Sequence, residues 1–228
     1  RPEAIYNMER LLDEAARVSG IDRVELRRKN FVKPEQMPYK NPMGQVYDTG
    51  AFEMIMNEAL EKADWHGFAN REAASKAQGL WRGLGIATFL EWTGGNALEE
   101  NVQVQILADG MIEVASAVNA MGQGIATSLA QLVVDVFGVD ISQVRVVLGD
   151  TDRANGFGSA GSRSLFTGGS AMRVGAEKTL DKARDLAGQA LEASPADLTY
   201  QGGKFSVKGT DLQISLADLA KRQPDARI

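Results

Sequence analysis

The first part of the chain carries apolar residues at helical spacing. Over residues 2–19 they recur every three or four positions before the stop signal Gly20, which predicts an amphipathic helix. A shorter helix is expected over residues 22–30. The stretch 31–45 contains three prolines, which prevent regular structure, so we expect a loop there.

A third helix and a polar junction follow. The helix begins after Asp48 or Thr49, either of which can cap its N-terminus, and its apolar stripe ends at Ala63. The next stretch, residues 70–78, is polar and indicates a junction between two parts of the chain.

From Leu80 onward the hydrophobic period changes to that of strands, with helices between them. Strands are expected over residues 83–92, 101–107, 111–118 and 144–148. The turn pair Asp109-Gly110 joins the second and third of these into a hairpin. An apolar stripe from Ile125 to Val136 predicts a helix that Gly138 ends.

The remaining chain predicts a long loop, a long helix and a small C-terminal unit. Residues 150–169 are rich in Gly and Ser and lack an apolar period, and a helix is expected over residues 170–193. A hairpin over 199–207 and a helix over 215–221 follow. The order predicts an α+β fold in which a helical N-terminal segment, residues 1–76, precedes a mixed sheet-and-helix domain, residues 77–228.

Composition narrows the classes of function. The chain has 228 residues, 44% hydrophobic and 24% charged, with a net charge of -5 and interspersed signs, so nucleic acid is not an expected partner. The absence of cysteine excludes thiolate metal sites and iron-sulfur ligation within this chain. No apolar run is long enough to cross a membrane, and a cytoplasmic protein is expected. The single histidine, His66, is interpreted as a surface residue.

Met121-Gly122-Gln123-Gly124 is the first candidate site. It lies between an expected strand and an expected helix, where two glycines can bring backbone N–H groups to the positive end of the helix. Such a site favours phosphate or another anion, and Gln123 offers both a donor and an acceptor. A plain strand-to-helix turn explains these few residues equally simply, because glycine is common in tight turns.

The second candidate site is the glycine- and serine-rich stretch at residues 156–164. Its glycines, hydroxyls and Arg163 could bind a phosphorylated ligand. Gly156, Gly158 and Gly161 also match a dinucleotide-binding spacing. That motif must follow a strand directly and open a helix, and here intervening residues separate it from both, so we do not adopt a Rossmann fold.

Three further features have simpler structural readings. Asp150-Thr151 at a strand end could bind a ligand, although an Asx-type turn is the simpler interpretation. Glu91 ends an apolar strand and is expected to be exposed. The run Arg27-Arg28-Lys29 is interpreted as a solvated helix face.

Taken in order and at their mutual spacing, several segments resemble the large subunit of the molybdenum hydroxylases, the family of xanthine dehydrogenase, aldehyde oxidase and carbon monoxide dehydrogenase. The Gly-Ser-Arg-Ser form is most similar to the carbon monoxide dehydrogenase-like bacterial branch. The segments are Arg1-Pro2-Glu3-Ala4 leading to residues 25–31, Tyr47-Asp48-Thr49-Gly50, residues 83–87, Met121-Gly122-Gln123-Gly124 with Thr127 and Gln131, Gly149-Asp150-Thr151, and Gly161-Ser162-Arg163-Ser164.

The resemblance implies an enzyme that hydroxylates an aldehyde or N-heterocycle, or oxidises carbon monoxide, with oxygen taken from water. Its cofactor would be molybdenum-molybdopterin, in the cytosine dinucleotide form typical of bacterial members. Residues 1–76 would close the first cofactor-binding domain and residues 77–228 would begin the second. The cofactor-binding residues carried over by position are Gly122, Gln123, Gly124, Thr127, Asp150, Thr151, Gly161, Ser162, Arg163 and Ser164.

The resemblance also implies partners and a missing base. Electrons would leave through iron-sulfur and flavin subunits or equivalent domains, in a dimer of heterotrimers. The family's general-base glutamate would lie beyond Ile228, so this chain by itself holds no expected catalytic or metal-ligating residue, and we expect it alone to be inactive and without cofactor. The alternative from another class is a non-catalytic binding or assembly module that retained the same fold.

Overall fold

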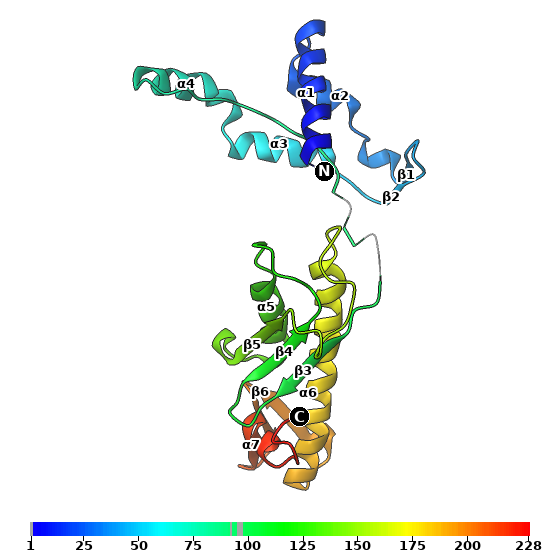
Figure 1. Ribbon diagram of the computed structural model, residues 1–228, viewed down its shortest axis with the longest axis vertical. Helices are drawn as coiled ribbons and strands as arrows, with labels where there is room; N and C mark the ends of the chain where they lie inside the picture. The colour runs from blue at the N-terminus through cyan, green and yellow to red at the C-terminus, as the bar shows by residue number, and fades with distance from the viewer. Residues whose placement is uncertain (1, 92, 95–97) are drawn as a thin grey trace. The chain divides into compact units, whose positions relative to one another are not determined.

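The computed structural model describes residues 2–91, 93–94 and 98–228 (Figure 1). They form two compact units, one within Arg1–Glu91 and one within Trp92–Ile228. Helices dominate the first unit, and the second combines sheets with helices. The α+β class expected from the sequence is confirmed. The assignment of residues 1–76 and 77–228 to two cofactor-binding domains stays a prediction.

Two helices open the first unit as expected. Helix α1 spans Pro2–Ser19 and helix α2 spans Arg23–Asn30. The Asp22 carboxylate caps α2 by accepting the N–H groups of Val24 and Glu25 at 2.8 and 3.1 Å.

The solvated face expected for Arg27-Arg28-Lys29 is wrong for its first residue. The Arg27 side chain is 1% exposed and forms ion pairs with Glu9 at 2.8 Å and with Asp13 at 2.9 Å. Both carboxylates come from α1, and a buried guanidinium needs such partners. The charge pattern of α2 alone could not show that α1 would cover it.

The middle of the first unit differs from the sequence prediction at two places. Strand β1 (Tyr39–Lys40) lies within the expected loop and forms a short antiparallel pair with β2 (Val46–Tyr47) just after it. Helix α3 spans Phe52–Lys62. The N-cap of α3 is Ala51, which makes no side-chain capping bond. Neither Asp48 nor Thr49 caps it, and the Asp48 carboxylate accepts the Thr49 N–H at 2.9 Å instead.

The polar junction expected over residues 70–78 is also wrong. Helix α4 spans Phe68–Ala77 and follows a single turn, Trp65–Gly67. Its sequence is polar because much of its surface is exposed, and polar helix-forming residues sustain a helix without an apolar stripe. His66 lies exposed in the preceding turn, as expected.

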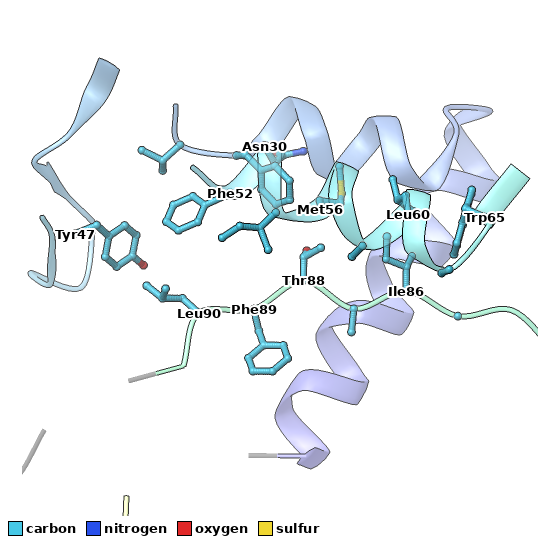
Figure 2. Close-up of a pocket in the computed structure, with 17 residues that line it drawn as sticks. Asn30, Tyr47, Phe52, Met56, Leu60, Trp65, Ile86, Thr88, Phe89 and Leu90 are labelled. Atoms are coloured by element: carbon cyan, nitrogen blue, oxygen red, sulfur yellow. The ribbon is translucent and has the colours of Figure 1, made fainter. Parts of the chain in front are cut away.

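The strand expected over residues 83–92 does not form in its described part, residues 83–91; Trp92 lies outside the described residues. The alternation is real, since Leu84, Ile86 and Thr88 are half-buried and their neighbours are exposed. Figure 2 shows Ile86 and Thr88 pointing toward α3 and Phe89 pointing away. A strand also needs a neighbouring strand for its backbone. Here arginine side chains of α2 reach the carbonyls of Leu84 and Ile86, each at 3.4 Å.

A mixed three-stranded sheet organises the second unit. Strands β3 (Val102–Ile106) and β4 (Ile112–Ser116) form the expected hairpin, and β5 (Val144–Leu148) pairs with β4 in parallel. Helix α5 (Ile125–Phe137) connects β4 to β5 and ends at Gly138, which adopts φ +58°. Helix α6 (Gly169–Leu191) contacts β3 and α5 (Figure 1).

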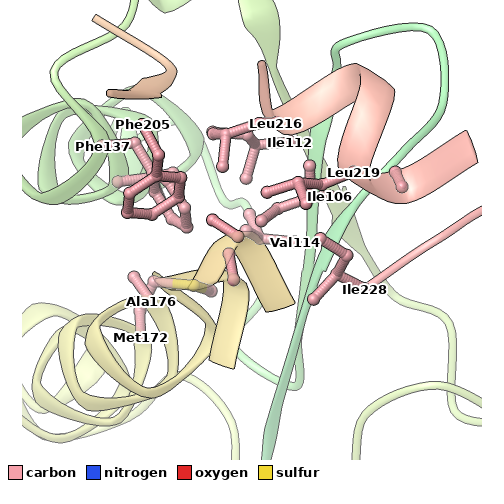
Figure 3. Packing of buried hydrophobic residues seen from close by; sticks show 14 of the residues in the cluster. Ile106, Ile112, Val114, Phe137, Met172, Ala176, Phe205, Leu216, Leu219 and Ile228 are labelled. Atoms are coloured by element: carbon pink, nitrogen blue, oxygen red, sulfur yellow. The ribbon is translucent and has the colours of Figure 1, made fainter. Parts of the chain in front are cut away.

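The hydrophobic core lies between this sheet and its helices. Period-two alternation sends every second strand residue toward α5 and α6, which contribute their own apolar stripes. Figure 3 shows this packing. Fully buried members of the cluster include Ile106, Ile112, Val114, Leu129, Val133, Phe137, Met172, Ala176 and Phe205.

A second small sheet completes the unit. Strands β6 (Leu198–Gln201) and β7 (Lys204–Val207) form the expected hairpin, β8 (Gln213–Ser215) pairs with β7, and helix α7 spans Leu216–Lys221. The short β8 was not expected from the sequence. Among the described residues, no helix combines the length and the apolar character that crossing a membrane requires.

The phenol of Tyr200 gives a prediction about alkaline stability. Its hydroxyl donates to the Phe137 carbonyl at 2.7 Å, and burial raises the pKa of Tyr200 from 10.0 to about 12. Because the folded-state pKa is raised, this contribution to stability is complete below pH 10 and is lost as the pH rises toward 12. We therefore expect Tyr200→Phe to make the free energy of unfolding less dependent on pH between pH 10 and 12. Urea titrations at several pH values measure this dependence. If the prediction is wrong, the unfolding free energies of Tyr200→Phe and of the wild type will change equally with pH between pH 10 and 12.

Candidate functional site

Three of the predicted segments gather at one end of the second unit. Strands β4 and β5 are parallel, and Ser116 is opposite Leu148. The loops that follow them therefore leave the same edge of the sheet. One of these loops leads into α5 and the other leads, through the glycine- and serine-rich segment, into α6 (Figure 1).

The glutamine loop forms an open helix N-terminus. Gly124 is the N-cap of α5 with φ +74° and makes no side-chain capping bond, and Gly122 has φ +91°. A Cβ atom added at either glycine would meet nothing within 4 Å. The first backbone N–H groups of α5 therefore remain available to an anion, beside the exposed Thr127.

The side chain of Gln123 braces its own loop. Its amide nitrogen Nε2 donates to the Asn119 carbonyl at 2.8 Å, and its oxygen Oε1 accepts the Met121 N–H at 2.5 Å. These bonds hold the turn closed while the residue itself stays exposed. The donor and acceptor capacity expected for Gln123 is present and is used locally.

Two serines tie the glutamine loop to the second candidate segment. Ser159 Oγ accepts the Asn119 N–H at 2.8 Å and donates to the Asn119 carbonyl at 3.0 Å. Ser164 Oγ donates to Ser159 Oγ at 2.8 Å. The structure thus brings Gln123 and Ser164 into one hydrogen-bond network through Asn119 and Ser159. Ser159 belongs to the predicted glycine- and serine-rich segment, and Asn119 was not expected at the site.

The Gly161-Ser162-Arg163-Ser164 turn is open on one side and anchored on the other. Gly161 and Ser162 are exposed with φ +56° and +60°, and the Gly94 N–H donates to the Ser162 carbonyl at 3.3 Å. The Arg163 side chain, in contrast, is only 1% exposed and forms an ion pair with Glu100. Gly161 and Ser162 are thus the exposed part of this turn, and the buried Arg163 guanidinium anchors it to Glu100.

The expected Asp150-Thr151 turn is confirmed as an Asx turn. The Asp150 carboxylate accepts the Asp152 N–H at 3.1 Å, and Thr151 is exposed. Arg153, two residues after Thr151, anchors this loop on the sheet by donating to Glu113 at 2.6 Å.

Electrostatics reinforce this anchor on β4. Hydrogen bonding to Arg153 lowers the pKa of Glu113, burial opposes the shift, and Arg145 lowers the pKa further. Glu113 is therefore charged at neutral pH and keeps the start of the loop on the sheet. Glu91, also considered in the sequence, is exposed as expected.

The roles of three residues at this site could not be predicted from the sequence, because their partners are distant in the chain. Asn119, Ser159 and Glu100 act through backbone and side-chain partners 40 to 63 positions away. Ser159 lies in the stretch 156–164 whose hydroxyls were predicted to bind a ligand, although it was not among the residues carried over from the family. Nothing in the local pattern around Glu100 distinguishes it from the adjacent, exposed Glu99.

The first unit has an apolar groove of its own. It has a volume of about 680 Å³ between α3 and residues 85–90 (Figure 2). Its lining includes Phe52, Met56 and Leu60 and none of the predicted cofactor residues. Most of its lining is apolar, with Asn30, Tyr47 and Thr88 among the few polar side chains.

The loop-bearing end fits an anionic cofactor. It combines an uncapped helix N-terminus, exposed glycine backbone and serine hydroxyls, which are the donors that phosphate and pterin groups require. In the described part of the chain, no group of three or more His, Cys, Asp or Glu side chains is arranged to hold a metal ion. Fold and loops together define an α+β domain whose loop-bearing end carries donors suited to an anionic ligand.

The profile of the molybdopterin cofactor-binding domain family matches residues 58–227. The chain therefore belongs to this family. It is 34% identical over 226 residues to the gamma subunit of the 6-hydroxypseudooxynicotine dehydrogenase complex of Paenarthrobacter nicotinovorans, covering 96% of this chain and 28% of that protein. It is 31% identical to the carbon monoxide dehydrogenase large chain of Hydrogenophaga pseudoflava, covering 96% and 29%.

Solved structures agree with the family. Quinoline 2-oxidoreductase from Pseudomonas putida 86 superposes with a TM-score of 0.72 at 31% identity, covering 93% of this chain and 28% of that chain. Reconstituted CO dehydrogenase from Oligotropha carboxidovorans gives 0.70 at 31% identity, covering 96% and 29%. The chain thus spans less than a third of the length of the relatives it matches. The predicted family is confirmed.

Proposed function

We propose that this chain is part of the large subunit of a molybdenum-dependent hydroxylase and that its second unit holds one side of the molybdopterin cofactor. The observation that carries the proposal is the network that joins the open N-terminus of α5 to the Gly161–Ser164 turn through Asn119 and Ser159. Two segments 40 residues apart that share one hydrogen-bond network can bind one ligand from two sides.

The roles of the residues follow from their geometry. The backbone N–H groups at Gly124 and the first turn of α5 would bind phosphate, and the outward backbone of Gly161 and Ser162 with the Ser164 hydroxyl would bind the pterin or its nucleotide. Gln123 would orient the pterin-metal end by exchanging one of its local bonds for a ligand bond. Asp150 and Thr151 would border the site.

The molybdenum cofactor, when bound, supplies the redox chemistry that transfers oxygen from water to a substrate carbon. This chain's residues bind and orient it. We further propose the cytosine dinucleotide form, iron-sulfur and flavin subunits as partners, a dimer of heterotrimers, and a cytoplasmic location. The substrate class, aldehyde, N-heterocycle or carbon monoxide, is proposed from the relatives and not from a residue of this chain. The 228-residue chain alone is expected to be inactive.

A non-catalytic binding or assembly module is the second candidate. It would keep the fold and would not need the donors at the loop-bearing end. The presence of both the glutamine loop and the Gly161–Ser164 turn in one network favours the cofactor-binding function. Metal analysis of the full-length parent protein separates the two, since a module of this second kind would contain no molybdenum.

Replacing Gln123 in the full-length parent tests the proposal. Gln123→Ala should change the melting temperature only slightly, because the two bonds that its exposed side chain makes stay within one surface turn. Loss of one bond to a strongly polar ligand costs roughly 1.5–3 kcal/mol, or about one to two decades in cofactor affinity or in activity per molybdenum. Gln123→Glu keeps the acceptor for the Met121 N–H and should also impair binding, because it places negative charge beside an anion.

The matched control is Gln201→Ala, which removes an exposed glutamine from β6. Cofactor content and activity per molybdenum are measured in all three variants. A Gln123→Ala protein with full cofactor and undiminished activity per molybdenum would place this loop outside the site.

A further inference from the structure

Glu100 is a buried acidic residue outside the predicted set of cofactor residues. Its side chain is only 2% exposed, and the residue forms a β-bridge with Gly156 just before β3 begins. Burying a carboxylate is unfavourable unless charged or hydrogen-bonding partners compensate for lost hydration. The structural role of Glu100 therefore follows from the groups that its carboxylate binds.

Those partners form a closed ring with Gly158. Glu100 Oε1 accepts the Gly158 N–H at 3.0 Å and a bond from Arg163 Nη1. The same Nη1 donates to the Gly158 carbonyl at 2.8 Å, and Nη2 donates to the Leu98 carbonyl at 2.7 Å. Both backbone polar groups of Gly158 are thus fixed by one ion pair. The segment between Gly158 and Arg163 is held at both ends.

The position of Gly158 determines where Ser159 lies. Gly158 has φ +84°, and a Cβ atom there would lie 3.2 Å from the Ala117 carbonyl, so the two backbones are in close contact. Ser159 follows directly and bonds both backbone groups of Asn119. The path from Glu100 to the glutamine loop therefore consists of consecutive, directly bonded residues.

We propose that Glu100 is a positioning residue for the cofactor site. Through Arg163 and Gly158 it fixes Ser159, and through Ser159 it holds the glutamine loop and the Gly161–Ser164 turn at one spacing. This inference rests on the proposed function and deepens it. Glu100 acts on the ligand through the shape of the two loops, and its carboxylate faces Arg163 and Gly158.

Replacing the Glu100–Arg163 ion pair with apolar residues can distinguish a positioning role from a role in packing alone. An apolar pair of similar volume often preserves stability at a buried ion pair. It cannot accept the Gly158 N–H or donate to the Gly158 carbonyl, so the loop loses its fixed position even when the fold survives. A positioning role thus predicts that stability and cofactor retention respond differently to the same substitution.

The test compares three variants of the full-length parent: Glu100→Gln, the double variant Glu100→Leu/Arg163→Met, and the control Glu99→Gln at the adjacent exposed glutamate. Thermal unfolding measures stability. Molybdenum and released pterin nucleotide per polypeptide, followed during dialysis, measure cofactor retention. Removing a residue that orients ligand-binding groups typically weakens binding roughly 10- to 100-fold, so cofactor should leave the double variant faster by about that factor.

The expected result is a double variant that melts close to the wild type and loses cofactor rapidly, with Glu99→Gln unchanged. A double variant that folds and retains cofactor like the wild type would overturn the inference. Failure of both Glu100 variants to fold would also overturn it, in favour of a purely structural ion pair. A wild-type parent without pterin nucleotide would instead refute the proposed function itself.

Discussion

Arg163→Ala is expected to lower the free energy of unfolding of the second unit by roughly 3–5 kcal/mol, because removing one partner leaves a buried charge without compensation. The Glu100 carboxylate would lose its guanidinium partner while both side chains are at most 2% exposed in the intact pair. The Gly158 and Leu98 carbonyls would also lose a donor. Urea unfolding followed by circular dichroism measures the change.

The control for this prediction is Arg173→Ala. Arg173 lies on α6, its side chain is 61% exposed, and it pairs with Glu177 at 3.0 Å across one helical turn. Exposed pairs of this kind contribute about 0.3–0.5 kcal/mol. Equal, small effects of the two substitutions would show that the Glu100–Arg163 pair is solvated in solution, and would remove the physical basis for a fixed Gly161–Ser164 turn.

Phe137→Ala should destabilise the second unit by roughly 3–5 kcal/mol, the usual effect of removing a fully buried aromatic ring. Phe137 is 0% exposed at the end of α5, and it belongs to the same buried cluster as Phe205 of the second sheet (Figure 3). The vacated space would therefore lie where α5 meets β6 and β7, and Tyr200, bonded to the Phe137 carbonyl, would lose a packed neighbour.

Denaturant unfolding of the variant, with Val174→Ala as control, measures this effect. Val174 lies on α6 and is 49% exposed, so its truncation should change stability by less than about 0.5 kcal/mol. An unfolding midpoint for Phe137→Ala within error of the control would mean that the two sheets of the second unit do not share one core.

The sequence by itself determined most of the elements of the second unit. The hairpin β3-β4, helix α5 with its Gly138 stop and strand β5 all appear where hydrophobic period and turn residues placed them. These elements depend on interactions between residues close in the chain, and the local spacing of apolar and turn residues therefore predicts them. The ordered motifs likewise determined the family, because a fixed set of spacings is far more specific than any single motif.

The tertiary structure decided what depends on distant partners. Residues 83–91 alternate like a strand and form none, because a strand requires a second strand that the hydrophobic period alone cannot supply. Arg27 looked solvated and is buried, because α1 brings two carboxylates against it. Glu100 and Asn119 became part of the site only when segments 40 to 63 residues apart met. The residues next to a charged or hydroxyl side chain in the sequence do not reveal its distant partner. Only the folded chain therefore shows which polar residues form the site.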